Sequence, residues 1–310
     1  MSHTTHRPWL PGILECLGEG EVLPNAPMSS RCTIRTGGAV AALCKPRSRD
    51  ALVAVLRFLH NEGVDFFPLG KGANLLVGDQ GYEGVALSLG DMPAEEEVQL
   101  FESRGELRLS AGQSISRLLS LGFSQGLVGA EFLSGIPGTL GGACAMNAGT
   151  PAGECMSLVL AVELATPEGA GWVEAKHLPH GYRYTQLPQG SVVLGLRFAL
   201  PTGDVAHSKE QLRKDLLHRK QVQPLELPSF GSAFKNPEGK YAGQLIDSVG
   251  LKGHTCGGAQ ISTKHANWIV NLGTATAHDV FRLMGMAVER VKTQHGIELV
   301  PEVKLKGVFE

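Results

Sequence analysis

The segment EFLSGIPGTLGGACAMNAG, residues 131–149, constrains the fold of this chain more than any other. Its glycines leave the backbone uncovered by side chains, which suits close approach by a ligand with many acceptor oxygens, such as a nucleotide pyrophosphate. Apolar residues such as Ile136, Leu140 and Met146 lie between the glycines, and a flexible linker would not need them. We therefore interpret the segment as a shaped cradle rather than a plain turn.

A second glycine-rich loop, PLGKGANLLVGD, spans residues 68–79. It is not the Gly-x-Gly-x-x-Gly dinucleotide fingerprint, because Leu75 stands where the third glycine belongs. A Rossmann domain is therefore not indicated. Each loop lies beside an apolar, strand-like run, so the two loops could hold one extended dinucleotide from both sides.

Length and composition exclude several classes of protein. A chain of 310 residues with 43% hydrophobic residues predicts two or three domains, and a net charge of -2 gives no electrostatic case for nucleic acid. No apolar run could span a bilayer, and residues 1–10 do not resemble a secretory signal. Six cysteines without a CxxC pair fit a reducing cytosol, and eleven histidines without an HExxH pair predict no metal site.

Apolar periodicity predicts three successive regions. Residues 39–89 read as strand, helix, strand, loop and strand, with Ser48 or Asp50 capping the helix and Gly63 ending it. Residues 90–200 are rich in strands, at 107–110, 158–165, 171–174 and 192–200, with one helix after Ser114. From residue 205 onward we expect a helix opened by a capping box of Ser208 and Gln211, helices at 241–248 and 276–295, and strands at 258–261 and 268–271.

Six motifs, in order, resemble the UDP-N-acetylenolpyruvoylglucosamine reductase family. They are TIRTGG (33–38), PLGKGANLLVGD (68–79), SGIPGTLGGACAMNAG (134–149), GYRYT (181–185), GSAFKNP (231–237) and PEVKLKG (301–307). The resemblance implies an α+β fold: a flavin-binding unit of two subdomains, similar to vanillyl-alcohol oxidase, plus a smaller α/β substrate domain. It implies the boundaries 1–89, 90–204 and 205–298, with a final strand at 299–310 returning to the first subdomain.

The resemblance also implies an activity. The family uses NADPH and FAD to reduce UDP-N-acetylglucosamine enolpyruvate to UDP-N-acetylmuramate for peptidoglycan synthesis. The implied enzyme is an oxidoreductase that acts on a CH–CH bond and contributes to cell wall biogenesis, cell shape and cell division. We accordingly expect a cytoplasmic bacterial monomer that binds one non-covalent FAD and small-molecule substrates. We expect it to bind neither nucleic acid nor a membrane.

The motif positions imply the site residues. Arg183 matches the arginine that meets the substrate carboxylate, Ser232 the proton donor, and Glu302 the catalytic glutamate. Tyr182, Lys235 and Asn236 are the implied substrate contacts. The implied cofactor contacts are Gly70, Lys71, Gly72, Ala73, Asn74, Leu75, Ser134, Gly135, Ile136, Gly138, Thr139, Gly141, Gly142 and Asn147. A bulky residue at Gly141 is expected to close the cradle.

Three features vary within the family pattern or stay open. Ala73 replaces a serine common in the first flavin loop, which removes one hydroxyl contact worth about 1 kcal/mol. No long tyrosine-bearing insertion follows Arg183, which is typical of the shorter subtype. A basic group before Pro224 is either a solvated helix face or a phosphate clamp for UDP or NADPH; it comprises Arg213, Lys214, His218, Arg219 and Lys220.

Two alternative functions explain part of the sequence. Another FAD-dependent oxidoreductase of the same superfamily, acting on an alcohol or hydroxy acid, would account for the glycine loops but not for Arg183, Ser232 and Glu302 together. A non-catalytic flavin- or nucleotide-binding module predicts that these three residues are lost, and all three are present.

Overall fold

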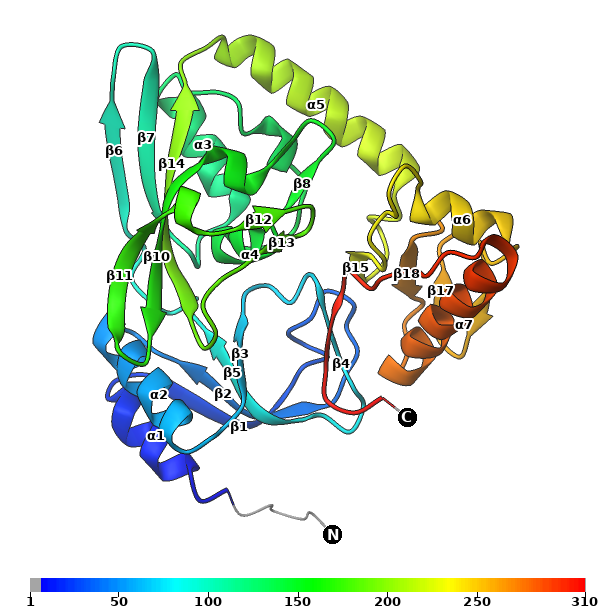
Figure 1. The fold of residues 1–310 in the computed structure, drawn as a ribbon, viewed down its shortest axis with the longest axis horizontal. Helices are drawn as coiled ribbons and strands as arrows, with labels where there is room; N and C mark the ends of the chain where they lie inside the picture. Colours follow the sequence, from blue (N-terminus) through cyan, green and yellow to red (C-terminus); the bar gives the residue numbers. More distant parts are fainter. Residues whose placement is uncertain (1–6, 310) are drawn as a thin grey trace. The chain divides into compact units, whose positions relative to one another are not determined.

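The structure, a computed structural model, describes residues 7–309 and forms two compact units (Figure 1). Unit 1 contains the chain up to Asn25, Ala41–Gly70 and Gly84–Ser208; unit 2 contains Ala26–Val40, Lys71–Glu83 and the chain from Lys209 onward. The expectation that residues 1–10 are not a secretory signal falls largely on residues 1–6, which lie outside the described part. Helices and strands are mixed in both units, in line with the predicted α+β class, while the three domain boundaries stay a prediction.

A four-stranded sheet lies mainly in unit 1, with strand order β1-β2-β5-β3. Its strands are β1 (Glu21–Pro27), β2 (Ala39–Lys45), β5 (Tyr82–Ser88) and β3 (Phe66–Leu69), and helices α1 (Leu10–Leu17) and α2 (Arg49–Asn61) accompany it. Ser48 caps α2 as predicted, because its hydroxyl accepts from the Ala51 amide at 3.1 Å. The apolar faces of α1 and α2 form one buried core with β2, β5, Ala165, Val192 and Leu194.

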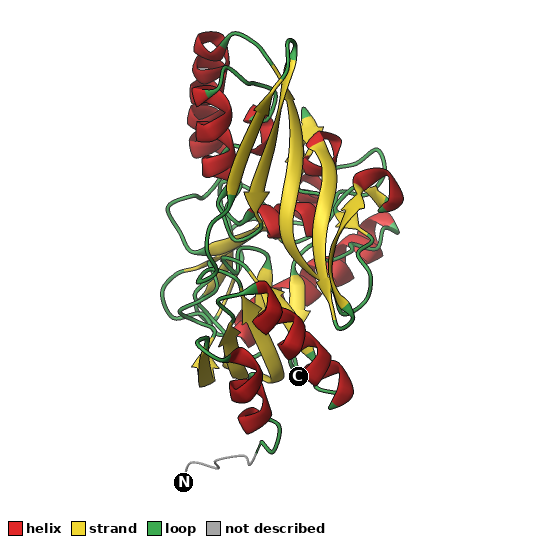
Figure 2. Ribbon diagram, turned by 90° about the vertical axis from the view of Figure 1, so that its left-hand side faces the viewer, coloured by secondary structure: helices red, strands yellow, loops and turns green. Residues whose placement is uncertain are grey.

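The larger sheet of unit 1 is antiparallel, with strand order β11-β10-β14-β7-β6, and its long strands are clear in Figure 2. The strands are β6 (Glu96–Leu100), β7 (Arg104–Ser110), β10 (Val159–Thr166), β11 (Gly169–Glu174) and β14 (Val192–Pro201). Helix α3 (Ile115–Ser124) begins after Ser114 as predicted, and α4 (Leu140–Ala145) lies inside the cradle segment. Short strand pairs complete the unit: β8 (Gly149–Thr150) with β9 (Gly153–Glu154), and β12 (His180–Gly181) with β13 (Tyr184–Thr185).

Unit 2 is built on a four-stranded antiparallel sheet with the order β15-β18-β17-β16. The strands are β15 (Ser229–Ser232), β16 (Thr255–Cys256), β17 (Ala259–Ile261) and β18 (Trp268–Asn271), with helices α6 (Ala242–Ser248) and α7 (Ala277–His295). A separate parallel pair joins β19 (Lys304–Lys306) to β4 (Leu75–Val77). The C-terminal strand therefore pairs directly with the first glycine loop.

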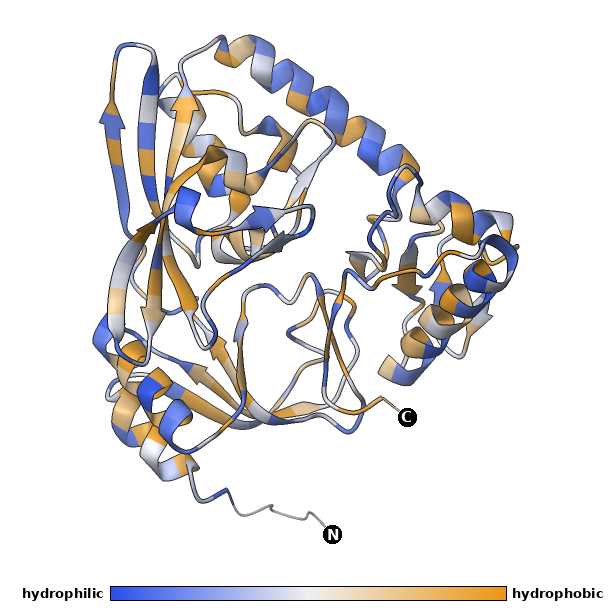
Figure 3. Ribbon diagram, in the orientation of Figure 1, coloured by the Kyte–Doolittle hydropathy of each residue, from blue (hydrophilic) through white to orange (hydrophobic). Residues whose placement is uncertain are grey.

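Helix α5 (Val205–Val222) corrects one prediction, because it begins before Ser208. Asp204 caps it: the Asp204 Oδ1 atom accepts from the His207 amide at 3.0 Å. Aspartate and serine are comparable caps, so the capping-box pattern at Ser208 and Gln211 placed the predicted helix start about one turn too late. Helix α5 buries no residue and is hydrophilic along much of its length (Figure 3).

All six cysteines are free, and burial raises the pKa of the Cys144 thiol to about 12, so that thiol stays protonated and unreactive near neutral pH. No helix between residues 7 and 309 combines the length and apolarity that crossing a membrane requires.

The first turn of α7 is capped from two directions. Thr276 and Asp279 form a reciprocal capping box, with both hydrogen bonds at 3.0 Å. The Asp79 carboxylate, at the end of the first glycine loop, accepts from the Ala277 and His278 amides at 2.8 and 2.9 Å. Burial acts to raise the pKa of Asp279, but hydrogen bonds, from the Thr276 and Gly258 amides first, outweigh it and lower this pKa overall.

Replacing Asp279 by asparagine should destabilise the protein at neutral pH and matter less in acid. The variant loses an acceptor charge at a helix N-terminus, which costs about 1 kcal/mol. Because folding lowers its pKa, the carboxylate stabilises the fold above its unfolded pKa, and this contribution is lost as pH falls through the folded pKa. The melting temperatures of D279N and wild type should therefore converge as the pH falls through the lowered pKa of Asp279. Exposed Asp65→Asn is the control, and a constant gap would contradict the assignment.

Candidate active site

The second glycine loop is anchored on the turn that follows β7. The Gly141 amide donates to the Ala111 carbonyl at 2.9 Å, and the Leu140 amide donates to the Gln113 carbonyl at 2.8 Å. Thr139 caps α4, and its hydroxyl accepts from the Gly142 amide at 3.3 Å. The amides of Gly141 and Gly142 are thus used inside the protein, which differs from the expectation that the loop glycines present uncovered amides.

The loop glycines serve two different purposes. An added Cβ atom at Gly141 would lie 2.9 Å from the Ala111 Cβ atom, and one at Gly70 would lie 2.7 Å from Thr139 Oγ1, so packing requires both glycines. At Gly138 an added Cβ would meet nothing within 4 Å, and at Gly142 its nearest neighbour is 3.5 Å away. The side-chain-free surface over Gly138 and Gly142 therefore fits a bound cofactor, whereas a bulky residue at Gly141 would strike Ala111 first.

Asn147 is fully buried, and its side chain makes three hydrogen bonds within the protein. Its Nδ2 atom donates to Glu154 Oε2 at 2.8 Å and to the Gly181 carbonyl at 3.0 Å, while its Oδ1 atom accepts from the Met156 amide at 2.9 Å. The backbone is left-handed, with φ 41°. Both side-chain hydrogens are used within the protein, so the Asn147 side chain has none left to donate to a cofactor.

Arg183 lies in the two-residue turn between β12 and β13. Its φ of 61° is uncommon for a residue other than glycine. Its guanidinium donates from Nη2 to the Gly149 carbonyl at 2.8 Å, and its Cζ atom lies 4.9 Å from the centroid of the Tyr182 ring. Tyr182 is 43% exposed, so it flanks the guanidinium without burying it.

The first glycine loop continues into unit 2 at Lys71. Gly72 has φ 61°, and a side chain there would collide with the Arg31 carbonyl oxygen. The Gly72 carbonyl accepts from the Thr33 amide at 3.1 Å, which ties the loop to the TIRTGG motif. Asn74 donates from its side chain to the Glu302 carbonyl at 3.1 Å, and its own carbonyl accepts from the Lys304 amide at 3.0 Å. Unit 2 thus brings this predicted cofactor loop beside a predicted catalytic residue.

The GSAFKNP motif pairs with the C-terminal segment. The Glu302 amide donates to the Ala233 carbonyl and the Lys235 amide to the Val300 carbonyl, both at 2.9 Å. Ser232 is therefore next to a residue that is hydrogen-bonded to Glu302. The structure brings Ser232, Lys235 and Glu302 into one part of unit 2, whereas Arg183 belongs to unit 1.

Buried Asn267 holds the centre of the GSAFKNP motif. Its Oδ1 atom accepts from the Phe234 amide at 3.0 Å, and its Nδ2 atom donates to the Phe234 carbonyl at 2.8 Å. Asn236 is exposed, and its side-chain oxygen accepts from the Ala242 amide at 3.0 Å, at the start of α6. The sequence analysis missed Asn267, since nothing in its local pattern distinguishes it from a strand-end asparagine.

Lys304 interacts electrostatically with two other lysines, Lys235 and Lys306, and with Glu302. Burial, and then the charges of Lys235 and Lys306, lower the pKa of Lys304, against the opposite effect of Glu302. Such a group of lysines attracts anionic groups, including carboxylate and phosphate.

The basic group of α5 is partly neutralised within the helix. Arg213 forms an ion pair with Glu210 at 3.1 Å, and Lys214 approaches the same carboxylate at 3.8 Å. The Arg219 side chain donates to Gln223 at 3.2 Å. For Arg213 and Lys214 these contacts favour the solvated face over the phosphate clamp.

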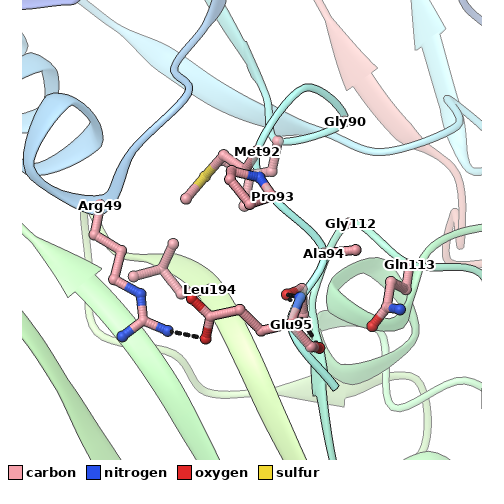
Figure 4. Close-up of a pocket in the computed structure, with 11 residues that line it drawn as sticks. Arg49, Gly90, Met92, Pro93, Ala94, Glu95, Gly112, Gln113 and Leu194 are labelled. Atoms are coloured by element: carbon pink, nitrogen blue, oxygen red, sulfur yellow. Dashed lines mark hydrogen bonds and ion pairs between the residues drawn. The ribbon is translucent and has the colours of Figure 1, made fainter.

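A pocket of about 100 Å³ lies in unit 1 between residues 89–95 and the turn at 110–113 (Figure 4). Arg49 lies on its rim, where its guanidinium pairs with Glu95 at 2.8 Å. The sequence analysis did not identify this pocket. Ligand pockets usually measure about 300–1,000 Å³, so this one is too small for a whole dinucleotide. Its wall at Gly112 and Gln113 belongs to the turn that anchors the cradle.

Comparisons with known proteins give two family matches and close relatives. Residues 40–172 match a family described as "FAD binding domain", and residues 223–306 match "UDP-N-acetylenolpyruvoylglucosamine reductase, C-terminal domain". The chain is 50% identical over 296 residues to the UDP-N-acetylenolpyruvoylglucosamine reductase of Myxococcus xanthus, covering 96% of each. It is 49% identical to that of Anaeromyxobacter sp. (strain K), covering 94% of this chain and 87% of the relative. The crystal structure of the Thermus caldophilus reductase matches with a TM-score of 0.77 and 32% identity, covering 93% of this chain and 99% of that one.

Substitutions at the two adjacent glycines should separate packing from cofactor binding. The Cβ atom of Gly142→Val would make only an ordinary contact, 3.5 Å from Thr139 Oγ1, so the flavin-free protein should keep its melting temperature. Bound FAD, read from visible absorbance per chain, should fall sharply. Gly141→Ala should instead destabilise the protein by about 1–3 kcal/mol through overpacking against Ala111. Full flavin occupancy in G142V would place the cofactor elsewhere.

Proposed function

The chain belongs to the UDP-N-acetylenolpyruvoylglucosamine reductase family, and from this we infer that it reduces UDP-N-acetylglucosamine enolpyruvate to UDP-N-acetylmuramate with NADPH and FAD. The reaction adds a hydride and a proton across the enolpyruvyl double bond and leaves NADP⁺. The observation that carries the proposal is the pairing of residues 300–302 with 233–235, which joins Glu302 to the Ser232 segment within unit 2.

The chemistry sets what the protein must supply. Hydride addition to the methylene carbon pushes negative charge onto the carbon that bears the carboxylate. The site must stabilise that charge and then deliver a proton to the same carbon. A fixed cation and a hydroxyl acid meet these two needs.

Arg183 is the proposed cation. A guanidinium stays charged throughout and can hold a carboxylate with two parallel hydrogen bonds. Its uncommon φ and its bond to Gly149 support this role, because backbone strain persists only where the surroundings enforce it. The half-exposed Tyr182 ring beneath it supports a substrate contact for that residue.

Ser232 is the proposed proton donor, with Glu302 sharing in charge and proton handling. Serine is a weak acid in water, so this role needs neighbours that stabilise its alkoxide. The charges of Lys235, Lys304 and Lys306 support such stabilisation. Lys235 and exposed Asn236 are the proposed contacts to the UDP-sugar.

FAD, when bound, supplies the hydride and is itself reduced by NADPH. The residues proposed to hold it are those of the two glycine loops, with the open surface at Gly138 and Gly142 as the support from this structure. We place this activity in the bacterial cytoplasm, with a monomer acting on small molecules and without nucleic acid or membrane. The free cysteines are compatible with that compartment.

Arg183→Lys should depress the substrate half-reaction far more than a charge-conserving change suggests. The bidentate grip is lost, at a cost on the order of 3 kcal/mol, or about a hundredfold in rate. Stopped-flow absorbance measures how fast reduced flavin is reoxidised by the enolpyruvyl substrate. Arg197→Lys, at an exposed position on β14, is the matched control. Normal turnover of Arg183→Ala would overturn the carboxylate assignment.

Ser232→Ala should affect only one half-reaction. NADPH should bleach the flavin at a near-normal rate, while reoxidation by substrate becomes very slow, because no proton reaches the substrate carbon. Glu302→Gln should show the same split, and Ser229→Ala on the same strand should behave as wild type. Equal slowing of both halves would mean that Ser232 maintains structure, and unimpaired reoxidation would remove it from the mechanism.

A further inference from the structure

Three side-chain hydrogen bonds fasten the end of the cradle to the hairpin that carries Arg183. Asn147 Nδ2 donates to the Gly181 carbonyl at 3.0 Å, Arg183 Nη2 donates to the Gly149 carbonyl at 2.8 Å, and Thr185 Oγ1 donates to the Cys144 carbonyl at 2.6 Å. All these residues belong to unit 1. The hairpin is thereby bonded to residues 144–149 at three points: Gly181, Arg183 itself and Thr185.

The hairpin has little structure of its own. Strands β12 and β13 have two residues each, paired only as His180 with Thr185 and Gly181 with Tyr184. An isolated hairpin of this size is not stable in water. Its geometry, and with it the left-handed backbone of Arg183, must therefore be imposed by its neighbours.

Asn147 can impose that geometry because its own orientation is fixed. Glu154 and the Met156 amide contact opposite ends of the Asn147 amide, so only one of its two flipped orientations satisfies both. In that orientation the second amide hydrogen points to the Gly181 carbonyl. Complete burial protects these bonds from competition by water.

We propose that Asn147, Glu154 and Thr185 are positioning residues that orient the Arg183 guanidinium toward the substrate carboxylate. The inference rests on the proposed function, in which Arg183 binds that carboxylate. It gives Asn147 a role different from the cofactor contact that its motif implies. A small displacement of a charged group that holds a reacting substrate weakens its interaction with that substrate. Loss of these hydrogen bonds should therefore lower the affinity for the substrate.

Thr185→Val tests the proposal with little risk to the fold. The Cys144 carbonyl also accepts from the Asn147 amide at 3.0 Å, so removing the Thr185 hydroxyl leaves no unpaired buried carbonyl. Thr185→Ser keeps the hydroxyl and is the matched control. Asn147→Gly is a second variant, because glycine tolerates the φ of 41°, and it removes the bonds to Glu154, Gly181 and Met156 together.

The measurement is calorimetric binding to the FAD-loaded protein with two ligands, UDP-N-acetylglucosamine enolpyruvate and UDP-N-acetylglucosamine, which has no carboxylate. For Thr185→Val and Asn147→Gly, the Kd of the enolpyruvyl ligand should rise about tenfold, the order expected for one orienting hydrogen bond. The Kd of UDP-N-acetylglucosamine should not change, and Thr185→Ser should bind both ligands as wild type does. Bleaching by NADPH should proceed normally in Thr185→Val and Thr185→Ser.

The possible results separate the inference from the proposed function. Equal weakening of both ligands, or loss of FAD, would show a merely structural role and overturn the inference. If Arg183→Ala binds the enolpyruvyl ligand poorly while Thr185→Val and Asn147→Gly bind it normally, only the positioning inference fails. If Arg183→Ala itself binds normally, the carboxylate assignment fails and the inference fails with it.

Discussion

Buried asparagine side chains form hydrogen bonds to the backbone amides and carbonyls of the irregular segments on which the candidate site is built. Asn147, Asn267 and Asn271 are at most 4% exposed. Asn147 joins the cradle to the Arg183 hairpin, Asn267 brackets Phe234 in the GSAFKNP motif, and Asn271 donates to the Ile34 carbonyl of the TIRTGG motif at 3.0 Å. Loops cannot pair their amides in a ladder as strands do, and an unpaired buried amide or carbonyl costs about 1–3 kcal/mol. The asparagine amide supplies a donor and an acceptor together, and this makes precise loops possible in the interior.

This arrangement lets sequence motifs act together although they lie far apart in the chain. In unit 2 the C-terminal segment pairs first with GSAFKNP and then, through β19, with β4 inside the first glycine loop. Asn74 donates to the carbonyl of Glu302 across 228 positions of sequence. In unit 1 the corresponding connection joins Asn147 to Gly181. The proposed cofactor loops and the proposed catalytic residues are consequently held by the same hydrogen bonds, so a change in one should be transmitted to the other within each unit.

Local signals predicted the regular elements well. Helices α2 and α3 begin after Ser48 and Ser114 as predicted, and α7 begins one residue after its predicted start at Thr276. In each case a capping side chain bonds to an amide only three residues away. Strand β6 was missed since its charged residues have no apolar alternation, and α5 was started too late because two caps compete there. In the candidate site, the family resemblance indicated which residues take part but not which residues they contact. The neighbours of Gly141 and the hydrogen bonds of Asn147 depend on segments that meet only after folding, so no local pattern could reveal them.

The central claim is that this chain reduces an enolpyruvyl ether through a flavin, and one anaerobic experiment tests it most directly. The visible spectrum of the FAD-loaded protein is recorded after addition of NADPH, and again after addition of UDP-N-acetylglucosamine enolpyruvate. The account predicts that the yellow colour bleaches, then returns with the enolpyruvyl substrate, and that UDP-N-acetylmuramate forms in an amount equal to the flavin reoxidised. Failure of the colour to return, or an equal return with UDP-N-acetylglucosamine, would contradict it.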